Sequence, residues 1–293
     1  MSHSSGNSPQ RVLLQVAGGN VELVRGGRGD GRPILCAAHP ADAFVEGTVE
    51  LLSDAAPGSE IVCVNPRGLG GSSPAPTLSL EQMVDDVEAT RLKLGIERWV
   101  FWGMSGGGWL AQLYAKRFPS SLAGIIVESA CLCFRDRLRD PACVLSPFFP
   151  AWHSALTERG LLQLDSHAAP SPGADTEWLD LPNVGQVFRR RGGPVLLVSP
   201  APVALAMQRI MPRLWEFDSR PWIREVRTPT LVLCGIADPI VPVSHAKAVH
   251  EAVVGSTFAA IEGASHVPTA QRHPDAMRAV RGFVHSVLHK TKP

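Results

Sequence analysis

The stretch W-V-F-W-G-M-S-G-G-G, residues Trp99 to Gly108, decides the fold. Its apolar beginning, Val100-Phe-Trp102, predicts a buried strand, and the residues from Trp109 onward predict a helix. Between them, Gly103-Met-Ser-Gly-Gly107 matches the pattern G-x-S-x-G. A hydroxyl that attacks an acyl carbon must stand clear of the sheet, and a sharp turn flanked by glycines allows this. The stretch therefore predicts strand, tight turn and helix, with Ser105 as candidate nucleophile.

The motif alone is also compatible with a glycine-rich turn that has no catalytic role. The Gly106 N–H lies at the start of the predicted helix, where an oxyanion would develop beside Ser105. A dinucleotide-binding fingerprint fits less well, because G-x-x-G-G-G lacks the glycine two residues after the first. The rest of the chain must decide between these interpretations.

Composition excludes several classes of protein. The chain has 293 residues, 45% hydrophobic and 19% charged, which is typical of a soluble globular protein with a large core. Its formal net charge of +1 gives no reason to expect nucleic acid or a membrane as partner. No apolar run reaches transmembrane length. Residues 1–10 lack the regions of a signal peptide, so a flexible tail and a cytoplasmic location are expected.

The six cysteines predict neither disulfides nor a metal centre. Cys36, Cys63 and Cys234 lie in apolar runs that predict buried strands, where a free thiol behaves as a small hydrophobic group. Cys131 and Cys133 form C-x-C, and no histidine or cysteine at zinc-site spacing completes a set of ligands. We expect reduced thiols, no metal and no cofactor.

Predicted strands and helices alternate over residues 11–130 and again over 226–293, as a parallel sheet requires. Residues 131–225 break this alternation and are rich in proline and tryptophan. We therefore expect a flexible tail (1–10), two parts of one α/β core (11–130 and 226–293), and an inserted, largely helical cap (131–225).

Three polar side chains of the types that serine catalysis needs each follow a predicted strand. A serine hydroxyl requires a general base, usually histidine, and the histidine requires a carboxylate that fixes its tautomer. Ser105, Asp238 and His266 each lie on a loop after a predicted strand. Active groups gather at the carboxyl ends of strands in parallel α/β proteins, so we expect these three to meet.

At this point the chain resembles the α/β-hydrolase superfamily, of the esterase and proline-iminopeptidase-like kind with a helical cap. The matching segments are 67–72 (R-G-L-G-G-S), 103–107 (G-M-S-G-G), 235–242 (G-I-A-D-P-I-V-P) and 263–266 (G-A-S-H). The resemblance implies a mostly parallel eight-stranded sheet flanked by helices, with Ser105, Asp238 and His266 as the catalytic triad. It implies acyl transfer rather than the alkyl-enzyme chemistry of relatives that carry Asp at the turn.

The resemblance also assigns supporting residues. Relatives usually carry His-Gly before the oxyanion loop, whereas this chain has His39-Pro40. Proline has no N–H, so the oxyanion donors are expected to be the N–H groups of Ala41 and Gly106. His39 would fix this loop or line the pocket. Asn65 stands where relatives often have Asp, and we interpret it as structural.

Rival assignments remain open from the sequence. Glu128 also ends a predicted strand, and some relatives place their acid there. The alternative bases His245, His250, His285 and His289 fall in predicted helices, and His273 directly precedes another. A base must lie on a loop that reaches Ser105, which favours His266.

The substrate is expected to be a small-molecule ester or amide. Met104, Trp109, Trp152 and Trp215 are candidates for an apolar pocket, with packing between cap and core as the alternative. The leading hypothesis is a carboxylic ester hydrolase. A proline aminopeptidase, which would need cap carboxylates such as Glu216 and Asp218, a lactonase, a thioesterase and a C–C hydrolase are alternatives. A ligand receptor that binds without turnover is a hypothesis of another class.

Overall fold

The structure is a computed structural model of the 293-residue chain. It describes residues 7–27, 34–41, 44, 46–75, 78–146, 149–153, 176–181, 185–190, 195–198 and 201–289. Among the residues of the proposed pocket, the Trp152 side chain lies outside this described set.

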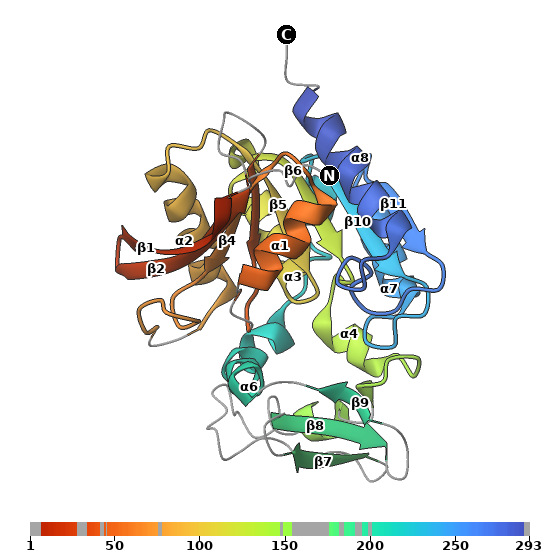
Figure 1. The fold of residues 1–293 in the computed structure, drawn as a ribbon. Coiled ribbons are helices and arrows are strands. Elements are labelled where there is room, and N and C mark those ends of the chain that lie inside the picture. Colours follow the sequence, from red (N-terminus) through yellow and green to blue (C-terminus); the bar gives the residue numbers. More distant parts are fainter. Residues whose placement is uncertain are drawn as a thin grey trace, which may run out of the picture.

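One twisted sheet of eight strands organises the core (Figure 1). It opens with an antiparallel hairpin, and its other six strands run parallel to one another. In spatial order the strands are β1 (Asn7–Val16), β2 (Gly19–Gly27), β4 (Glu60–Asn65), β3 (Ile34–Ala38), β5 (Trp99–Met104), β6 (Leu122–Glu128), β10 (Thr230–Gly235) and β11 (Thr257–Ile261). The predicted eight-stranded, mostly parallel sheet is therefore confirmed.

Helices cover both faces of this sheet and bury a core on each. On one face lie α1 (Glu46–Ala55) and α8 (Pro274–His289), whose apolar side chains join the smaller core. On the other face lie α2 (Leu80–Lys93), α3 (Gly107–Arg117) and α7 (Val243–Ala252). Strands β5 and β6 are buried along their whole length, which explains their continuous apolar runs.

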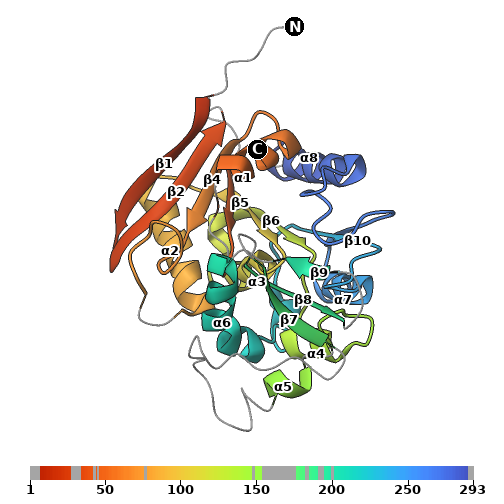
Figure 2. The same cartoon turned by 60° about the horizontal axis from the view of Figure 1, so that its bottom comes forward.

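The segment between β6 and β10 is of mixed structure. It contains α4 (Phe134–Arg139), α5 (Phe149–His153) and α6 (Ala201–Glu216), and also an antiparallel three-stranded sheet of β7 (Thr176–Leu181), β8 (Gly185–Arg190) and β9 (Val195–Val198). Figures 1 and 2 show these elements together on one side of the core, beyond the end of β6. We predicted helices in this segment but not this sheet, because β7 and β8 carry charged residues and the apolar run of β9, V-L-L-V, is only four residues long.

The cysteines, the helices and the potential metal ligands add three observations. All six cysteines are buried free thiols. Of the helices formed by described residues, none combines the length and the apolar character needed to cross a bilayer. Within the same ranges, no three His, Cys, Asp or Glu side chains cluster so that they could hold a metal ion.

Candidate active site

The turn after β5 holds Ser105 in a strained conformation. Its φ is 50°, in the left-handed region that residues other than glycine rarely adopt. The Ser105 N–H donates to the Glu128 carbonyl at 2.8 Å, and the Gly108 N–H donates to the Ser105 carbonyl at 2.9 Å. A Cβ atom on Gly103 would lie 2.1 Å from the Gly107 oxygen, so the turn can close only around a glycine. The local geometry is that of a nucleophile elbow.

His266 bridges the other two predicted side chains. Its Nε2 lies 2.9 Å from Ser105 Oγ, and its Nδ1 lies 2.8 Å from Asp238 Oδ2. These groups are 161 and 28 residues away from His266 in the chain, and they meet because β5, β10 and β11 end at the same edge of the sheet. The structure therefore brings together all three residues that the sequence selected.

Asp238 is held rigidly beneath the imidazole. Its side chain is fully buried, whereas the His266 side chain keeps 19% of its surface exposed. Asp238 Oδ1 accepts hydrogen bonds from the N–H groups of Ile240 and Val241, both at 2.9 Å. This leaves Oδ2 to accept from Nδ1–H. The unprotonated nitrogen, Nε2, then directs its lone pair at the Ser105 hydroxyl.

The two predicted oxyanion donors, the N–H groups of Gly106 and Ala41, have different surroundings. Gly106 lies against the His39 ring, since a Cβ on Gly106 would come 2.8 Å from His39 Nε2. The Ala41 N–H donates to His39 Nδ1 at 3.2 Å, so Ala41 serves an oxyanion only when this long bond opens. Burial, together with the charge on His266, lowers the pKa of His39 to about 4. His39 is therefore neutral near pH 7 and accepts at Nδ1.

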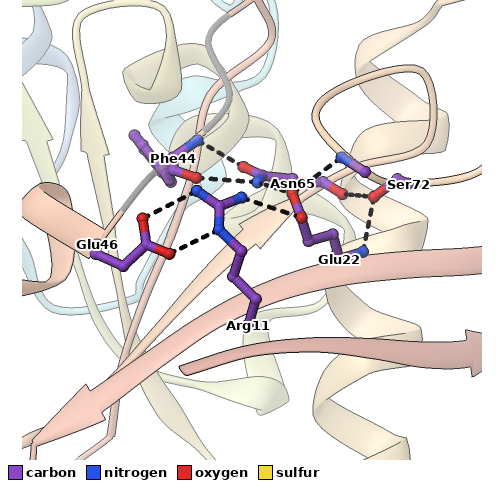
Figure 3. A network of polar contacts seen from close by, with 7 residues as sticks. Arg11, Glu22, Phe44, Glu46, Asn65 and Ser72 are labelled. Atoms are coloured by element: carbon purple, nitrogen blue, oxygen red, sulfur yellow. Dashed lines mark hydrogen bonds and ion pairs between the residues drawn. The ribbon is translucent and has the colours of Figure 1, made fainter. Parts of the chain in front are cut away.

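Asn65 forms hydrogen bonds with Phe44, which follows the predicted oxyanion loop (Figure 3). Its Oδ1 accepts from the Phe44 N–H at 2.7 Å, while its Nδ2 donates to the Phe44 carbonyl at 3.1 Å and to Glu22 Oε2 at 2.8 Å. An aspartate here could not make either donation and would face the Glu22 carboxylate. The departure from the family pattern is thus explained by this hydrogen-bond set, and the structural interpretation of Asn65 agrees with it.

Glu22 connects this network to the opening hairpin. It accepts from the Gly71 N–H at 3.0 Å and pairs with Arg11 at 3.1 Å, and Arg11 also pairs with Glu46 (Figure 3). Burial raises the pKa of Glu22, but the hydrogen bonds from Gly71, Asn65 and Arg11 outweigh burial and hold it below its usual range.

The rival carboxylate Glu128 contacts other groups. It is fully buried, and its side chain accepts from Trp102 Nε1 at 2.9 Å and from the Thr269 N–H at 2.9 Å. Burial raises the pKa of Glu128. In this geometry Asp238, not Glu128, is the hydrogen-bond partner of His266.

Three of the rival histidines have local partners, and the side chain of a further one, His289, lies outside the described residues. His245 Nε2 lies 3.0 Å from Asp140 Oδ2, and His250 Nδ1 lies 2.7 Å from Ser256 Oγ. His273 accepts from the Asp275 N–H at 3.3 Å. Of these three histidines and His266, His266 is the one whose ring lies within hydrogen-bond distance of Ser105 Oγ.

The proposed pocket residues lie in packed surroundings. Met104 is buried in the core beneath α1 and α8. Trp109 meets Phe134 edge to face, with ring centroids 5.4 Å apart. Trp215 is 4% exposed and stacks on Phe149. These contacts fit the alternative that the residues serve packing. Trp109 packs the inserted segment against the core, and Trp215 packs two parts of the inserted segment against each other.

The two carboxylates that an aminopeptidase would need, Glu216 and Asp218, have arginine partners. Glu216 pairs with Arg213 at 3.2 Å and is half exposed, and Asp218 pairs with Arg220 at 2.5 Å. Both line a groove of about 440 Å³ with Lys116 and the start of α2. None of the three aligned side chains lines this groove, so its carboxylates do not face Ser105.

Sequence reasoning missed the residues that support this site. Ser129, Val267 and Arg272 share the left-handed φ of Ser105, at 51°, 53° and 52°. Ser129 Oγ accepts from the Val267 N–H at 3.1 Å, and Thr269 binds Glu128. The available signal was their position, because Ser129 directly follows a strand end and Val267 directly follows His266.

Comparison with known proteins shows which fold family this chain resembles. A family model described as the alpha/beta hydrolase fold matches residues 36–154. A 3-oxoadipate enol-lactonase 2 from Acinetobacter baylyi is 25% identical over 72% of this chain and 73% of its own. A probable proline iminopeptidase from Streptomyces coelicolor is 29% identical over 42% of this chain and 40% of its own.

Solved structures agree. An alpha/beta fold family hydrolase from Bacillus anthracis superimposes with a TM-score of 0.68 at 17% identity, covering 95% of this chain and 99% of that one. At this identity the likeness is one of fold, and it extends across the core and the inserted segment. The family-model match over residues 36–154, the relatives and the topology together show that this chain has the α/β-hydrolase fold.

Proposed function

We propose that this protein is a serine hydrolase that cleaves carboxylic esters of small to medium apolar compounds through an acyl-enzyme on Ser105. The observation that carries the proposal is the position of His266, 2.9 Å from Ser105 Oγ and 2.8 Å from Asp238 Oδ2. These distances suit proton transfer in one direction and tautomer control in the other.

In the acylation step, His266 Nε2 takes the Ser105 hydroxyl proton while Oγ attacks the acyl carbon. The resulting oxyanion accepts from the Gly106 N–H at the start of α3, and from Ala41 once its bond to His39 opens. The imidazolium, stabilised by Asp238, then gives its proton to the leaving oxygen.

In the deacylation step, water replaces the departed alcohol. His266 Nε2 removes a proton from that water, and the hydroxide attacks the acyl carbon on Ser105. The tetrahedral intermediate collapses, Ser105 Oγ recovers its proton, and the acid product leaves. The two half-reactions use the same base and the same oxyanion donors.

Lactones are the nearest alternative substrates within the same chemistry. The enol-lactonase relative covers 72% of this chain, and a lactone is an ester whose alcohol stays attached to the acyl group. Release of an N-terminal proline is less supported, since the probable iminopeptidase aligns with 42% of this chain and Glu216 and Asp218 are paired with arginines. An aminopeptidase would need free carboxylates directed at the substrate amine.

The experiment combines labelling with turnover. We expect a fluorophosphonate probe to modify Ser105, p-nitrophenyl esters to be hydrolysed over many turnovers, and Ser105→Ala to abolish both. A panel of esters, lactones, thioesters and proline amides then ranks the substrate classes. Labelling without repeated turnover on any class would favour a ligand receptor, and turnover that survives Ser105→Ala would overturn the proposal.

A further inference from the structure

Two residues at the end of β6 connect the nucleophile to the loop of the base. The Glu128 carbonyl accepts from the Ser105 N–H at 2.8 Å. The Glu128 side chain accepts from the Thr269 N–H at 2.9 Å and lies 2.8 Å from Thr269 Oγ1. Glu128 and Thr269 are both fully buried. One residue therefore binds the Ser105 turn with its backbone and the loop after His266 with its carboxylate.

Ser129 adds a second connection directly beside the first. Its Oγ accepts from the Val267 N–H at 3.1 Å, and its own N–H donates to the Leu233 carbonyl in β10 at 2.8 Å. Ser129 and Val267 both have left-handed φ values, 51° and 53°. Such strain persists only where surrounding contacts hold it, and here the two strained residues hold each other.

We propose that Glu128 and Ser129 are positioning residues, which keep the His266 imidazole within proton-transfer distance of Ser105 by binding Thr269 and Val267. This inference rests on the proposed hydrolase function. Asp238 fixes the imidazole from the Nδ1 side, while Glu128 and Ser129 fix the backbone that carries it. Displacement of a reacting group by about 1 Å can lower the rate about 10²-fold. Contacts that fix the loop of His266 should therefore increase the rate.

The chemistry of position 128 explains why a carboxylate suits this task. Trp102 Nε1 donates to Oε2, and the Thr269 N–H donates to Oε1, each at 2.9 Å. Both oxygens must therefore accept from an N–H group. A glutamine of nearly the same volume would leave one of these donors facing its amide nitrogen, whichever way the amide is turned. Glu128→Gln thus breaks one contact with little change in packing.

Glu88→Gln is a matched control. Glu88 is also a buried carboxylate, 8% exposed, which pairs with Arg91 at 2.6 Å and accepts from Tyr114 at 2.7 Å and Ser121 at 3.0 Å. It lies in α2 and contacts none of Ser105, Asp238 or His266 among the described hydrogen bonds. The same chemical change is thus made in the same core, away from the loop of the base.

The test measures kcat and KM on a p-nitrophenyl ester together with the thermal midpoint. We expect Glu128→Gln to lower kcat about 10-fold or more with KM within twofold, and Glu88→Gln to lower the midpoint comparably with kcat within twofold. When Glu128→Gln is added to His266→Ala, we expect the residual kcat to fall by less than a further twofold. The inference would be overturned if Glu128→Gln left kcat unchanged. It would also be overturned if Glu128→Gln lowered kcat by the same factor in the His266→Ala variant as in the wild type.

A second variant keeps the inference falsifiable if Glu128→Gln does not fold. Ser129→Gly removes the acceptor of the Val267 N–H while tolerating the left-handed φ, and the same fall in kcat is expected. If His266→Ala keeps wild-type activity, the proposed function fails. If His266→Ala loses activity while Glu128→Gln, where folded, and Ser129→Gly keep it, only the positioning role fails.

Discussion

Replacing Asp238 by asparagine tests how the carboxylate serves the imidazole. Asp238 Oδ1 is fixed by the N–H groups of Ile240 and Val241, so the asparagine carbonyl oxygen will keep that place. The new NH₂ group then faces His266 Nδ1, which must accept instead of donate. The imidazole proton moves to Nε2, opposite Ser105 Oγ, and the base can no longer take the serine proton.

The expected loss follows from this tautomer change. Loss of the correct tautomer in a serine triad lowers kcat about 10⁴-fold, equivalent to about 5.4 kcal/mol of barrier. The backbone contacts of Oδ1 survive, so we expect a thermal midpoint within a few degrees of the wild type. The assay is steady-state hydrolysis of a p-nitrophenyl ester, with circular dichroism to follow unfolding.

Asp140→Asn provides the matched control for this prediction. Asp140 also forms an aspartate–histidine contact, 3.0 Å from His245 Nε2, and that pair does not reach Ser105. We expect its kcat to stay within twofold. A value for Asp238→Asn above one tenth of the wild-type kcat would refute the tautomer argument, as would an equal loss in Asp140→Asn.

Three further outcomes are expected. Ser105→Gly should be more stable in urea than Ser105→Ala by about 1 kcal/mol, because the φ of 50° costs a residue with a Cβ that much; equal midpoints would remove the claim of strain. The pKa of His39 is lowered from 6.5 to about 4, so the unfolded chain binds a proton at this residue before the folded chain does as pH falls. The free energy of unfolding should therefore drop by up to about 1.4 kcal/mol per pH unit below pH 6.5. In His39→Gln we expect a less steep drop. Tyr114→Phe leaves the buried Trp99 Nε1, now 3.0 Å from the Tyr114 hydroxyl, without its acceptor and should cost about 2 kcal/mol of unfolding free energy while kcat is unchanged; a thermal midpoint equal to the wild type would contradict this.

The core and the three aligned side chains could be predicted because each leaves a local signal. Buried parallel strands leave continuous apolar runs, such as 100–102 and 122–127. A strained turn needs glycines at fixed spacing, and Gly103 meets that need with no room for a Cβ. Asp238 and His266 follow strands whose carboxyl ends must meet in this topology.

The supporting contacts could not be predicted, because they depend on tertiary structure. The acceptor role of Ser129 toward Val267 joins residues 138 apart, and neither residue type favours a left-handed φ. The advantage of an asparagine over an aspartate at position 65 depends on its two acceptors, the Glu22 carboxylate and the Phe44 carbonyl, which come together only in the fold. Tryptophan marks burial but not its purpose, so Trp109 and Trp215 were compatible both with a pocket and with packing.

The three-stranded sheet of the inserted segment was missed for a related reason. Two of its strands, T-E-W-L-D-L of β7 and G-Q-V-F-R-R of β8, carry charged residues, and the apolar run of β9, V-L-L-V, is only four residues long. The available hairpin signal was the dipeptide Pro182-Asn183, of residue types typical of turns, between the sequences of β7 and β8. β7, β8 and β9 pair with one another in antiparallel register, and such pairing leaves little signal in each strand taken alone.

Trapping of the acyl-enzyme tests the central claim most directly. The protein is mixed with excess p-nitrophenyl ester, quenched with acid within the first turnovers, digested and analysed by mass spectrometry. We predict one equivalent of p-nitrophenol in the initial burst and an acyl group on the peptide that contains Ser105, with neither in Ser105→Ala. Rapid ester hydrolysis with no acyl group on that peptide, and with Ser105→Ala still active, would contradict the account.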